Sequence, residues 1–445
     1  MIELSPELVT IVMLGGLLIG VFSGFPMAYI VGFLGLVMGF FVWQWQAPQL
    51  IYMRAYSLML NYTLLAIPLF VFMGTILEYS GVVEKLFEAF YLWLGGLKGG
   101  LAVVTMIVGI IMAATVGVVS AAVTLLTLVA LPSMVKRGYN HAFAAGACVA
   151  GGVLGILIPP SIMLVIYGPM SNVSVGKLLF GAFGPGLMLG TLYIIYIIIR
   201  SILEPTLGPP VPAELRDVPL MKKITMLLTS FMPPVLLVIS VLGVIYLGIA
   251  AVTEAAAMGA FAATLLTIVY KRFTWKVLND TMITTVKLCG FILFVGAMSF
   301  AFTGVFLGAG GGEIVTNVIT AAPGGAWGAF FVMQFIVFVF GFFIDWIGIV
   351  FIMVPIISLA AQAIGFDPVW FAVMVCVNLQ TSFITPPFAM ALYICKGVAD
   401  PSLNVTLSEI LWGSFPYVAL ILAGMALCIA FPAIITWLPS QMLGK

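Results

Sequence analysis

GILIPPSIMLVIYG, Gly155 to Gly168, and its later counterpart SFITPPFAMALYICKG, Ser382 to Gly397, are the stretches that decide the fold of this chain. Each is apolar except for a polar break that contains two consecutive prolines. A proline pair removes two backbone hydrogen-bond donors and keeps the preceding residue out of helical geometry. Each stretch therefore predicts two half-helices joined by an open, non-helical segment.

The composition predicts that both breaks lie within a lipid bilayer. The chain has 445 residues, of which 64% are hydrophobic and 7% are charged. Its apolar runs repeatedly reach the roughly 20 residues that cross a bilayer. In lipid, broken backbone is tolerated only where it is buried in protein or lines a watery cavity. Two such breaks in corresponding positions of two halves are typical of the binding site of a secondary transporter. We predict an all-α polytopic membrane protein.

The same composition excludes other classes of function. The net charge of +1 and the lack of a Lys/Arg patch give no indication of nucleic-acid binding. The chain has one histidine and no glycine-rich phosphate loop, so neither a His-based zinc enzyme nor an ATPase is expected. We therefore expect no enzyme activity and no cofactor, and uphill transport must draw on an ion gradient. The acidic start, MIELSPE, predicts a retained helix rather than a cleaved signal.

Two further apolar segments, 101–135 and 326–364, are too long for one crossing and too short for two. Small or polar residues interrupt each of them near its middle. Each therefore predicts a re-entrant helical hairpin, which enters the membrane and returns to the same side. The Pro-Pro breaks lie in the segments that follow the hairpins, 142–170 and 368–397.

This order of elements divides the chain into two repeats. The first covers 1–203, a Pro-rich linker covers 204–223, and the second covers 224–445 and ends in a closing helix. Because the two hairpins are expected to enter from opposite faces, the repeats are predicted to be inverted in topology. We also expect uninterrupted apolar segments at 57–79 and 409–438.

Basic residues predict the orientation in the membrane. If the loop 136–141 and the linker are cytoplasmic, both termini lie outside, on the periplasmic face. Three basic residues then fall outside, namely Arg54, Lys177 and Lys445. Twelve of the sixteen fall inside, in agreement with the positive-inside rule: Lys85, Lys98, Lys136, Arg137, Arg200, Arg216, Lys222, Lys223, Lys271, Arg272, Lys276 and Lys396.

The residues around the breaks suit charged ligands. Half-helix N-termini attract anions, whereas half-helix C-termini and unwound carbonyls suit a hard cation such as sodium. Glycines before the first break, including Gly152 and Gly155, allow carbonyls to turn inward, and Ser161 is expected to cap the second half-helix. Before the second Pro-Pro pair, three hydroxyl side chains are available: Thr381, Ser382 and Thr385.

Asp345 is the most informative single residue, because a carboxylate inside GFFIDWIGIVFIMVP is costly in lipid. It is expected either to attract or ligate a cation, to carry a proton, or only to cap the second arm of its hairpin. Asn61 and Asn378 are polar residues inside predicted spans, for which a site role and interhelical hydrogen bonding are both open.

Six motifs, in this order along the chain, carry a resemblance to a known family. They are LLAIPLFVFMG (Leu64 to Gly74), LPSMVKRGYNHAFAAG (Leu131 to Gly146), GGVLGILIPPSIMLVIYG (Gly151 to Gly168), TEAAAMGA (Thr253 to Ala260), GFDPVWFAVMV (Gly365 to Val375) and ITPPFAMALY (Ile384 to Tyr393). At these residues the chain resembles the large membrane subunit of the tripartite ATP-independent periplasmic (TRAP) transporters. The resemblance implies an elevator-type symporter of the bacterial inner membrane, usually sodium-driven, that imports an organic acid such as a C4-dicarboxylate. It also implies two partners, a small four-helix membrane subunit and a periplasmic substrate-binding protein.

The resemblance also implies positions for the ligands. One sodium site would involve Gly117, Ser120, Gly152, Gly155 and Pro159, and the other Asp345, Gly348, Thr385 and Pro386. Polar residues near the tip and the breaks are assigned to the substrate: Thr115, Ser161, Asn378, Thr381 and Ser382. The sequence departs from many relatives at the first hairpin tip, where valines surround Gly117 in place of serines, so ligation by side-chain hydroxyls is in doubt there.

Two rival interpretations remain open. A stand-alone ion-coupled carboxylate transporter of similar architecture would need no binding protein. A channel or a structural membrane scaffold would use the Pro-Pro breaks to line a pore. Sodium-dependent, concentrative uptake that requires a binding protein would separate the TRAP interpretation from both.

Overall fold

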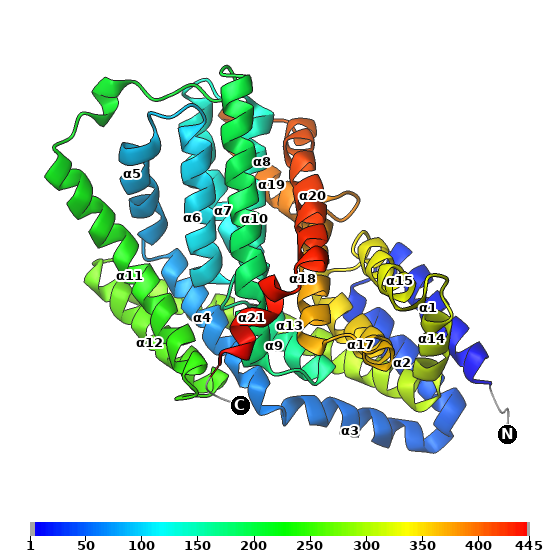
Figure 1. The fold of residues 1–445 in the computed structure, drawn as a ribbon. Coiled ribbons are helices and arrows are strands. Elements are labelled where there is room, and N and C mark those ends of the chain that lie inside the picture. Colours follow the sequence, from blue (N-terminus) through cyan, green and yellow to red (C-terminus); the bar gives the residue numbers. More distant parts are fainter. Residues whose placement is uncertain (1–4, 443–445) are drawn as a thin grey trace.

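The computed structural model describes residues 5–442, and every regular element in them is helical (Figure 1). The two ends of the chain, including Lys445, lie outside the described residues. Within this described range, seven helices are long and apolar enough to cross a membrane, or eight if the bent pair Tyr62–Glu78 and Val82–Leu94 is one span. The chain is thus a multi-pass membrane protein by the length and composition of its helices.

Residues 5–203 contain ten α-helices. They are α1 (Pro6–Phe22), α2 (Met27–Trp43), α3 (Ala47–Met59), α4 (Ala66–Glu78), α5 (Val82–Leu94), α6 (Gly100–Val116), α7 (Val119–Val135), α8 (His141–Val153), α9 (Ile162–Ser171) and α10 (Val175–Leu203). Short 3-10 turns lie at Gln44–Gln46, Tyr62–Leu65 and Leu154–Ile156.

The second half contains eleven. They are α11 (Leu220–Tyr246), α12 (Val252–Val269), α13 (Trp275–Gly308), α14 (Gly311–Thr320), α15 (Gly325–Phe340), α16 (Trp346–Gly348), α17 (Val354–Ile364), α18 (Pro368–Ile384), α19 (Met390–Val398), α20 (Leu407–Ala430) and α21 (Ala433–Ser440). A π-helical turn, Ile349–Met353, joins α16 to α17, and 3-10 turns lie at Ala213–Arg216 and Pro401–Leu403.

Both predicted hairpins are pairs of packed helices. In the first, α6 and α7 pack against each other and are separated only by Gly117 and Val118. In the second, α15 packs against α17, and the segment between them holds Asp345. The order of hairpin, broken helix and closing helix occurs in both halves. How each hairpin enters the membrane, and whether the repeats are inverted, remain predictions.

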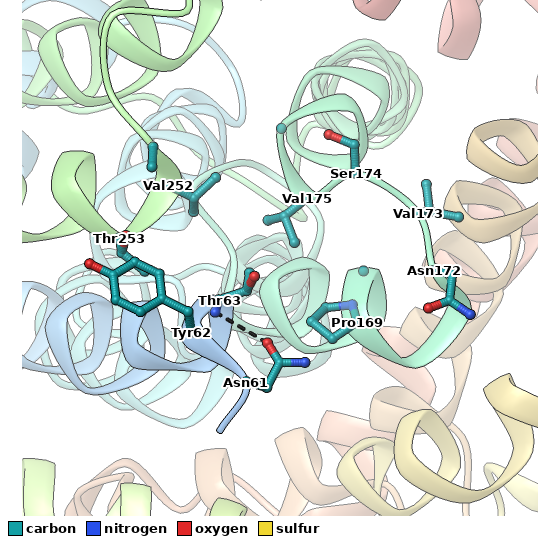
Figure 2. A pocket seen from close by; sticks show the side chains of 13 residues that line it. Asn61, Tyr62, Thr63, Pro169, Asn172, Val173, Ser174, Val175, Val252 and Thr253 are labelled. Atoms are coloured by element: carbon teal, nitrogen blue, oxygen red, sulfur yellow. Dashed lines mark hydrogen bonds between the residues drawn. The ribbon is translucent and has the colours of Figure 1, made fainter. Parts of the chain in front are cut away.

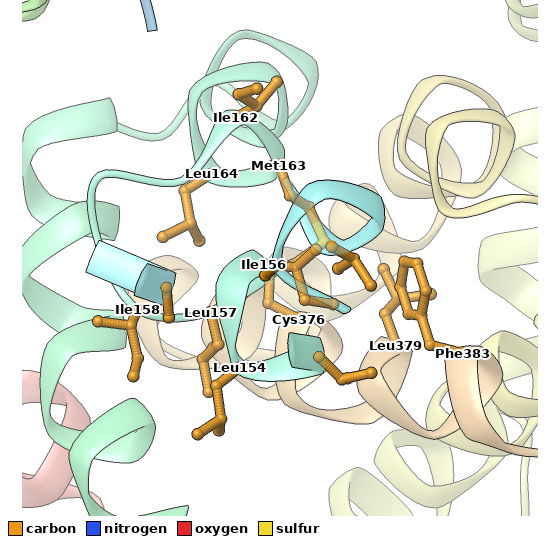
Figure 3. Close-up of a cluster of buried hydrophobic side chains, with 14 of the residues drawn as sticks. Leu154, Ile156, Leu157, Ile158, Ile162, Met163, Leu164, Cys376, Leu379 and Phe383 are labelled. Atoms are coloured by element: carbon orange, nitrogen blue, oxygen red, sulfur yellow. The ribbon is translucent and has the colours of Figure 1, made fainter. Parts of the chain in front are cut away.

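The helices of both Pro-Pro segments are interrupted. The first helix ends with α8 and a 3-10 turn and resumes as α9, and the second ends with α18 and resumes as α19. The two breaks lie close together in the core. Buried Ile156, just before the first break, and buried Phe383, at the end of α18, belong to one cluster of apolar side chains (Figure 3).

Two apolar segments that we expected to be continuous are divided. The segment 57–79 is interrupted after Leu60, because the Asn61 side chain accepts a hydrogen bond from the Thr63 amide and starts a 3-10 turn there. The segment 409–438 is interrupted at Phe431 and Pro432, between α20 and α21. Asn61 thus caps a short turn at a helix break rather than lying inside a span.

The linker packs onto the end of the molecule where the first hairpin begins and ends (top of Figure 1). The Gly99 amide donates to the Gly208 carbonyl at 2.8 Å, and the Val211 amide donates to the Gly95 carbonyl at 2.8 Å. The Asn140 amide donates to the carbonyl of the linker residue Leu207 at 3.1 Å. Loops that carry many of the basic residues therefore share one end, which is the arrangement that the predicted orientation requires.

Candidate functional site

A small cavity at the centre of the chain is bounded by both hairpin tips and by both helix breaks. Its volume is about 110 Å³. Helices α4 and α13 close its remaining side. The lining residues are Val71, Gly117, Val118, Val119, Ser120, Ile156, Ile162, Leu288, Phe291, Ile292, Asp345, Trp346, Ile347, Phe383 and Met390. We call this the central cavity.

The first hairpin tip depends on glycine. Gly117 has a φ of 65°, a left-handed conformation that costs a residue with a side chain about 1–2 kcal/mol. It also lies against the first break, since a Cβ added to it would lie 2.8 Å from the Pro160 carbonyl oxygen. Gly152 is equally confined, because its added Cβ would lie 2.8 Å from the Val123 amide nitrogen of α7. These contacts hold tip and break together.

Side chains at the first break satisfy the backbone of that break. Ser161 occupies the N-cap position of α9, but its hydroxyl makes no capping bond and donates instead to the Ile156 carbonyl. The expected cap is therefore correct in position and wrong in its hydrogen bond, because the unpaired carbonyl before the break competes for the hydroxyl. Thr115, just before the tip, donates to the Ile111 carbonyl at 3.0 Å.

Asp345 lies at the second hairpin tip and caps a helix. Its carboxylate accepts a hydrogen bond from the Trp346 amide at 2.8 Å, as the simplest interpretation of this residue expected. It is half-buried and lines the central cavity. The cap leaves the second carboxylate oxygen and the remaining lone pairs free for a further partner, so capping and cation binding are compatible.

The hydroxyls at the second break bond to their own helix. Thr381 donates to the Asn378 carbonyl at 2.7 Å, Ser382 to the Leu379 carbonyl at 2.6 Å, and Thr385 to the Thr381 carbonyl at 2.7 Å. Each hydroxyl thereby uses its proton, and its oxygen lone pairs remain available to a cation.

The structure therefore brings only some of the predicted ligand positions together. Gly117, Ser120 and Asp345 line the central cavity. The other predicted positions are not among the residues that line this cavity: Thr115, Gly152, Gly155, Pro159, Ser161, Gly348, Thr381, Ser382, Thr385 and Pro386. Their roles as ligands remain predictions.

Asn378 belongs to a different environment. Its side-chain amide donates to the Gln334 backbone carbonyl at 2.7 Å and to the Gln334 Oε1 at 2.9 Å. The pair lines a separate apolar cavity of about 670 Å³ among α15, α18 and α20. This hydrogen bonding joins the second hairpin to the second broken helix, which is the interhelical alternative left open for Asn378.

The side of the central cavity formed by α4 and α13 was not found from sequence. Leu288, Phe291 and Ile292 of α13 line it together with Val71 of α4. An apolar side chain that faces a cavity has the same sequence pattern as one that faces lipid, so no signal distinguished them. A neighbouring cavity of about 230 Å³ shares Val118, Ser120 and Leu288 with the central one; its other lining residues are Thr75, Glu78, Val116, Ala121, Thr124 and Thr284.

Among residues 5–442, no three His, Cys, Asp or Glu side chains gather in a way that suits a bound metal ion. A hard cation at the central cavity would therefore depend on Asp345 together with hydroxyl and backbone carbonyl oxygens. Sodium accepts such a ligand set in secondary transporters, where unwound carbonyls and half-helix ends coordinate it.

Comparisons with known proteins agree with this architecture. The family model described as tripartite ATP-independent periplasmic transporter, DctM component, matches residues 11–434. The C4-dicarboxylate TRAP transporter large permease protein of Vibrio cholerae is 30% identical over 86% of this chain and 87% of its own length. The sialic acid TRAP transporter large permease protein of the same organism is 28% identical over 86% of this chain and 88% of its own. The Alcanivorax borkumensis YdaH transporter superposes with a TM-score of 0.55 at 14% identity, over 85% of this chain and 89% of that one. The last similarity concerns the fold alone.

Proposed function

Because the chain belongs to the DctM component family of the tripartite ATP-independent periplasmic transporters, we propose that it is the translocating subunit of a sodium-coupled symporter that imports an organic acid across the bacterial inner membrane. In this proposal a periplasmic binding protein delivers the acid, and a small four-helix membrane subunit completes the complex. The observation that carries the proposal is the convergence of two hairpin tips and two helix breaks on one cavity that contains Asp345.

The charge at the central cavity supports coupling to a cation. Asp345 is its single ionisable lining residue, and no Lys or Arg of residues 5–442 lines it. An organic acid that approaches this cavity is repelled by the negative charge of Asp345. Two like charges 4 Å apart repel by up to about 4 kcal/mol at the effective dielectric near a protein surface. A cation bound beside Asp345 removes this repulsion, so the cation and the acid enter together.

The connection between cavities supports alternating access. The central cavity adjoins the cavity that contains Glu78, since Val118, Ser120 and Leu288 line both. Both lie along the boundary between the first hairpin and scaffold helices α4 and α13. In the proposed elevator mechanism the hairpins and broken helices move along this boundary, and the acid leaves through the second cavity.

The test is uptake into proteoliposomes that contain the chain and its small membrane subunit, with the binding protein outside. Succinate and N-acetylneuraminate represent the substrates named for the two relatives, and sodium is present on one side or absent. Accumulation that needs both sodium and the binding protein is the expected result. Accumulation without the binding protein would support the stand-alone carrier, and equilibration without accumulation would support a channel.

A matched pair of substitutions tests the coupling residue. Asp345→Asn and Asp367→Asn each change a capping carboxylate, since Asp367 accepts a hydrogen bond from the Trp370 amide at 2.8 Å. Asn caps helices about as well as Asp, so both variants are expected to fold. Asp345→Asn is expected to reduce sodium-driven uptake at least about tenfold, whereas Asp367→Asn retains it. Equal uptake in the two variants would exclude Asp345 from coupling.

A further inference from the structure

A second polar cavity lies at the end of the molecule opposite the linker, and the proposed function does not use it. Its volume is about 500 Å³, within the range of small-molecule sites. In the predicted orientation it opens on the periplasmic side. It is lined by Asn61, Tyr62, Thr63, Gly168, Pro169, Asn172, Val173, Ser174, Val175, Gly176, Ala251, Val252 and Thr253 (Figure 2). We call it the outer cavity.

The N-terminus of α10 points its partial positive charge at the outer cavity. This helix has 29 residues and begins at Val175, and its first turn holds no acidic residue to offset the dipole. Lys177 adds a positive charge in the same turn. The amides of Val175 and Gly176 have no acceptor among the described residues, so they are free to donate to a ligand.

The start of α12 supplies a second set of donors from the scaffold side. The amides of Val252 and Thr253 lack acceptors among the described residues, and the Thr253 hydroxyl is buried, with 7% of the residue exposed, and has no hydrogen-bond partner. An unpaired buried hydroxyl is costly unless a ligand satisfies it. The nearby Glu254 carboxylate opposes an anion, but it is exposed and already accepts the Ala251 amide at 2.9 Å.

The remaining polar side chains of the cavity are neutral. Asn61, Thr63, Asn172 and Ser174 contribute amides and hydroxyls, and no Asp or Glu of the described residues lines the outer cavity. The outer cavity therefore combines two helix N-termini, free backbone amides and neutral side-chain donors. Such a concave site binds a carboxylate.

We propose that the outer cavity binds the carboxylate of a small organic acid on the periplasmic face, before the acid reaches the central cavity. The site bridges the loop after broken helix α9 and the first residues of scaffold helix α12. This inference rests on the proposed function for the identity of the acid, but its test does not depend on transport.

The test measures the charge preference of a cysteine placed in the cavity. All five native cysteines are buried, so an introduced Thr63→Cys is expected to dominate labelling of the purified complex by methanethiosulfonates. The labelling rate of Thr63→Cys is measured with an anionic sulfonate reagent and with a cationic ammonium reagent, and the two rates are expressed as a ratio. The same ratio is measured for Thr316→Cys. Thr316 lines a separate surface cavity beside Glu313, which makes it a matched control of opposite charge. The ratio is expected to be higher at Thr63→Cys.

A charge substitution sharpens this measurement. Asn172 is exposed and has a φ of 57°, a conformation that Asp also tolerates, so Asn172→Asp adds one negative charge at the rim with little strain. It should lower the reagent ratio at Thr63→Cys roughly threefold to tenfold, and salt should weaken the effect. Asn404→Asp is the matched control, because Asn404 has a φ of 52° and is exposed in a loop elsewhere. It is expected to leave the ratio unchanged.

Protection identifies the ligand. Succinate or N-acetylneuraminate, without binding protein, should slow labelling of Thr63→Cys, and Asn172→Asp should weaken this protection. No protection by any organic acid would overturn the proposal, whatever the reagent ratio. Equal protection by inorganic sulfate would show an unselective anion site and overturn the assignment to organic acids. Protection that appears only with the binding protein would assign the cavity to docking of that partner. Failure of uptake with normal protection would instead count against the proposed function.

Discussion

Substitution of Gly117 by alanine tests whether the contact between the first hairpin tip and the first break is essential. Two costs follow from the structure. The φ of 65° costs a residue with a side chain about 1–2 kcal/mol. The added Cβ would lie 2.8 Å from the Pro160 carbonyl oxygen, and because this is backbone, tip and break must separate, at a cost of about 1–3 kcal/mol.

Two control variants separate these costs. Gly24 has a φ of 77° and nothing within 4 Å of an added Cβ, so Gly24→Ala carries the conformational cost alone. Gly155→Ala adds a methyl group near the same break, but its nearest neighbour lies 3.8 Å away. We expect the apparent Tm in detergent to fall most for Gly117→Ala, less for Gly24→Ala and least for Gly155→Ala.

Uptake in proteoliposomes then decides whether the contact matters for transport. Gly117→Ala is expected to abolish sodium-driven uptake, because it moves the tip that lines the central cavity. Gly24→Ala is expected to retain uptake. If Gly117→Ala had the Tm of Gly24→Ala and full uptake, the tip would not pack on Pro160 in the working protein, and the reasoning would fail.

Two further predictions concern hydrogen bonds that join elements. Burial raises the pKa of Tyr139 to about 12, so its hydroxyl is neutral, and it accepts a hydrogen bond from the Leu101 amide at 3.1 Å. Tyr139→Phe leaves this buried amide unpaired and should destabilise the protein by about 1–3 kcal/mol, which is measured as a lower Tm. Asn378→Leu removes both bonds to Gln334 and should destabilise by a similar ~1–3 kcal/mol, yet leave the sodium dependence of uptake unchanged, because Asn378 does not line the central cavity. A changed sodium dependence in Asn378→Leu would show that this residue acts on the coupling site.

The features that were predictable from sequence are those in which one residue type forces the backbone. Proline lacks an amide proton, which accounts for the interruption of the helices at the two Pro-Pro pairs. The re-entrant course of the hairpins, which we expect from segment length, stays a prediction. Asn61 was harder to interpret, because a polar residue inside an apolar run is also compatible with an interhelical hydrogen bond. Its short side chain competes for a nearby amide, and this local bond ends α3.

Most of the central cavity was not predictable, because its wall is apolar. Ile292 of α13 is buried and lines the cavity, whereas other apolar residues of the same helix, such as Val286, are exposed. Sequence shows how apolar a helix is but not which face another helix covers, since that depends on tertiary packing. The outer cavity was missed for a related reason: its donors are backbone amides, and no side-chain motif marks them.

The two cavities differ in charge, and this difference gives the proposed mechanism a direction. The outer cavity has free amides and no lining carboxylate among the described residues, so it favours an anion arriving alone. The central cavity has Asp345 and no lining cation in the same part of the chain, so it favours an anion only after a cation has bound. In the proposed mechanism, an acid held at the outer site gains free energy by moving inward only after sodium has neutralised the charge of Asp345 at the second hairpin tip. The proposed requirement for sodium then lies at the step between the two cavities. Because the valines of the first tip offer no side-chain oxygen, the sodium ligands of this mechanism would come from Ser120, Asp345 and the backbone.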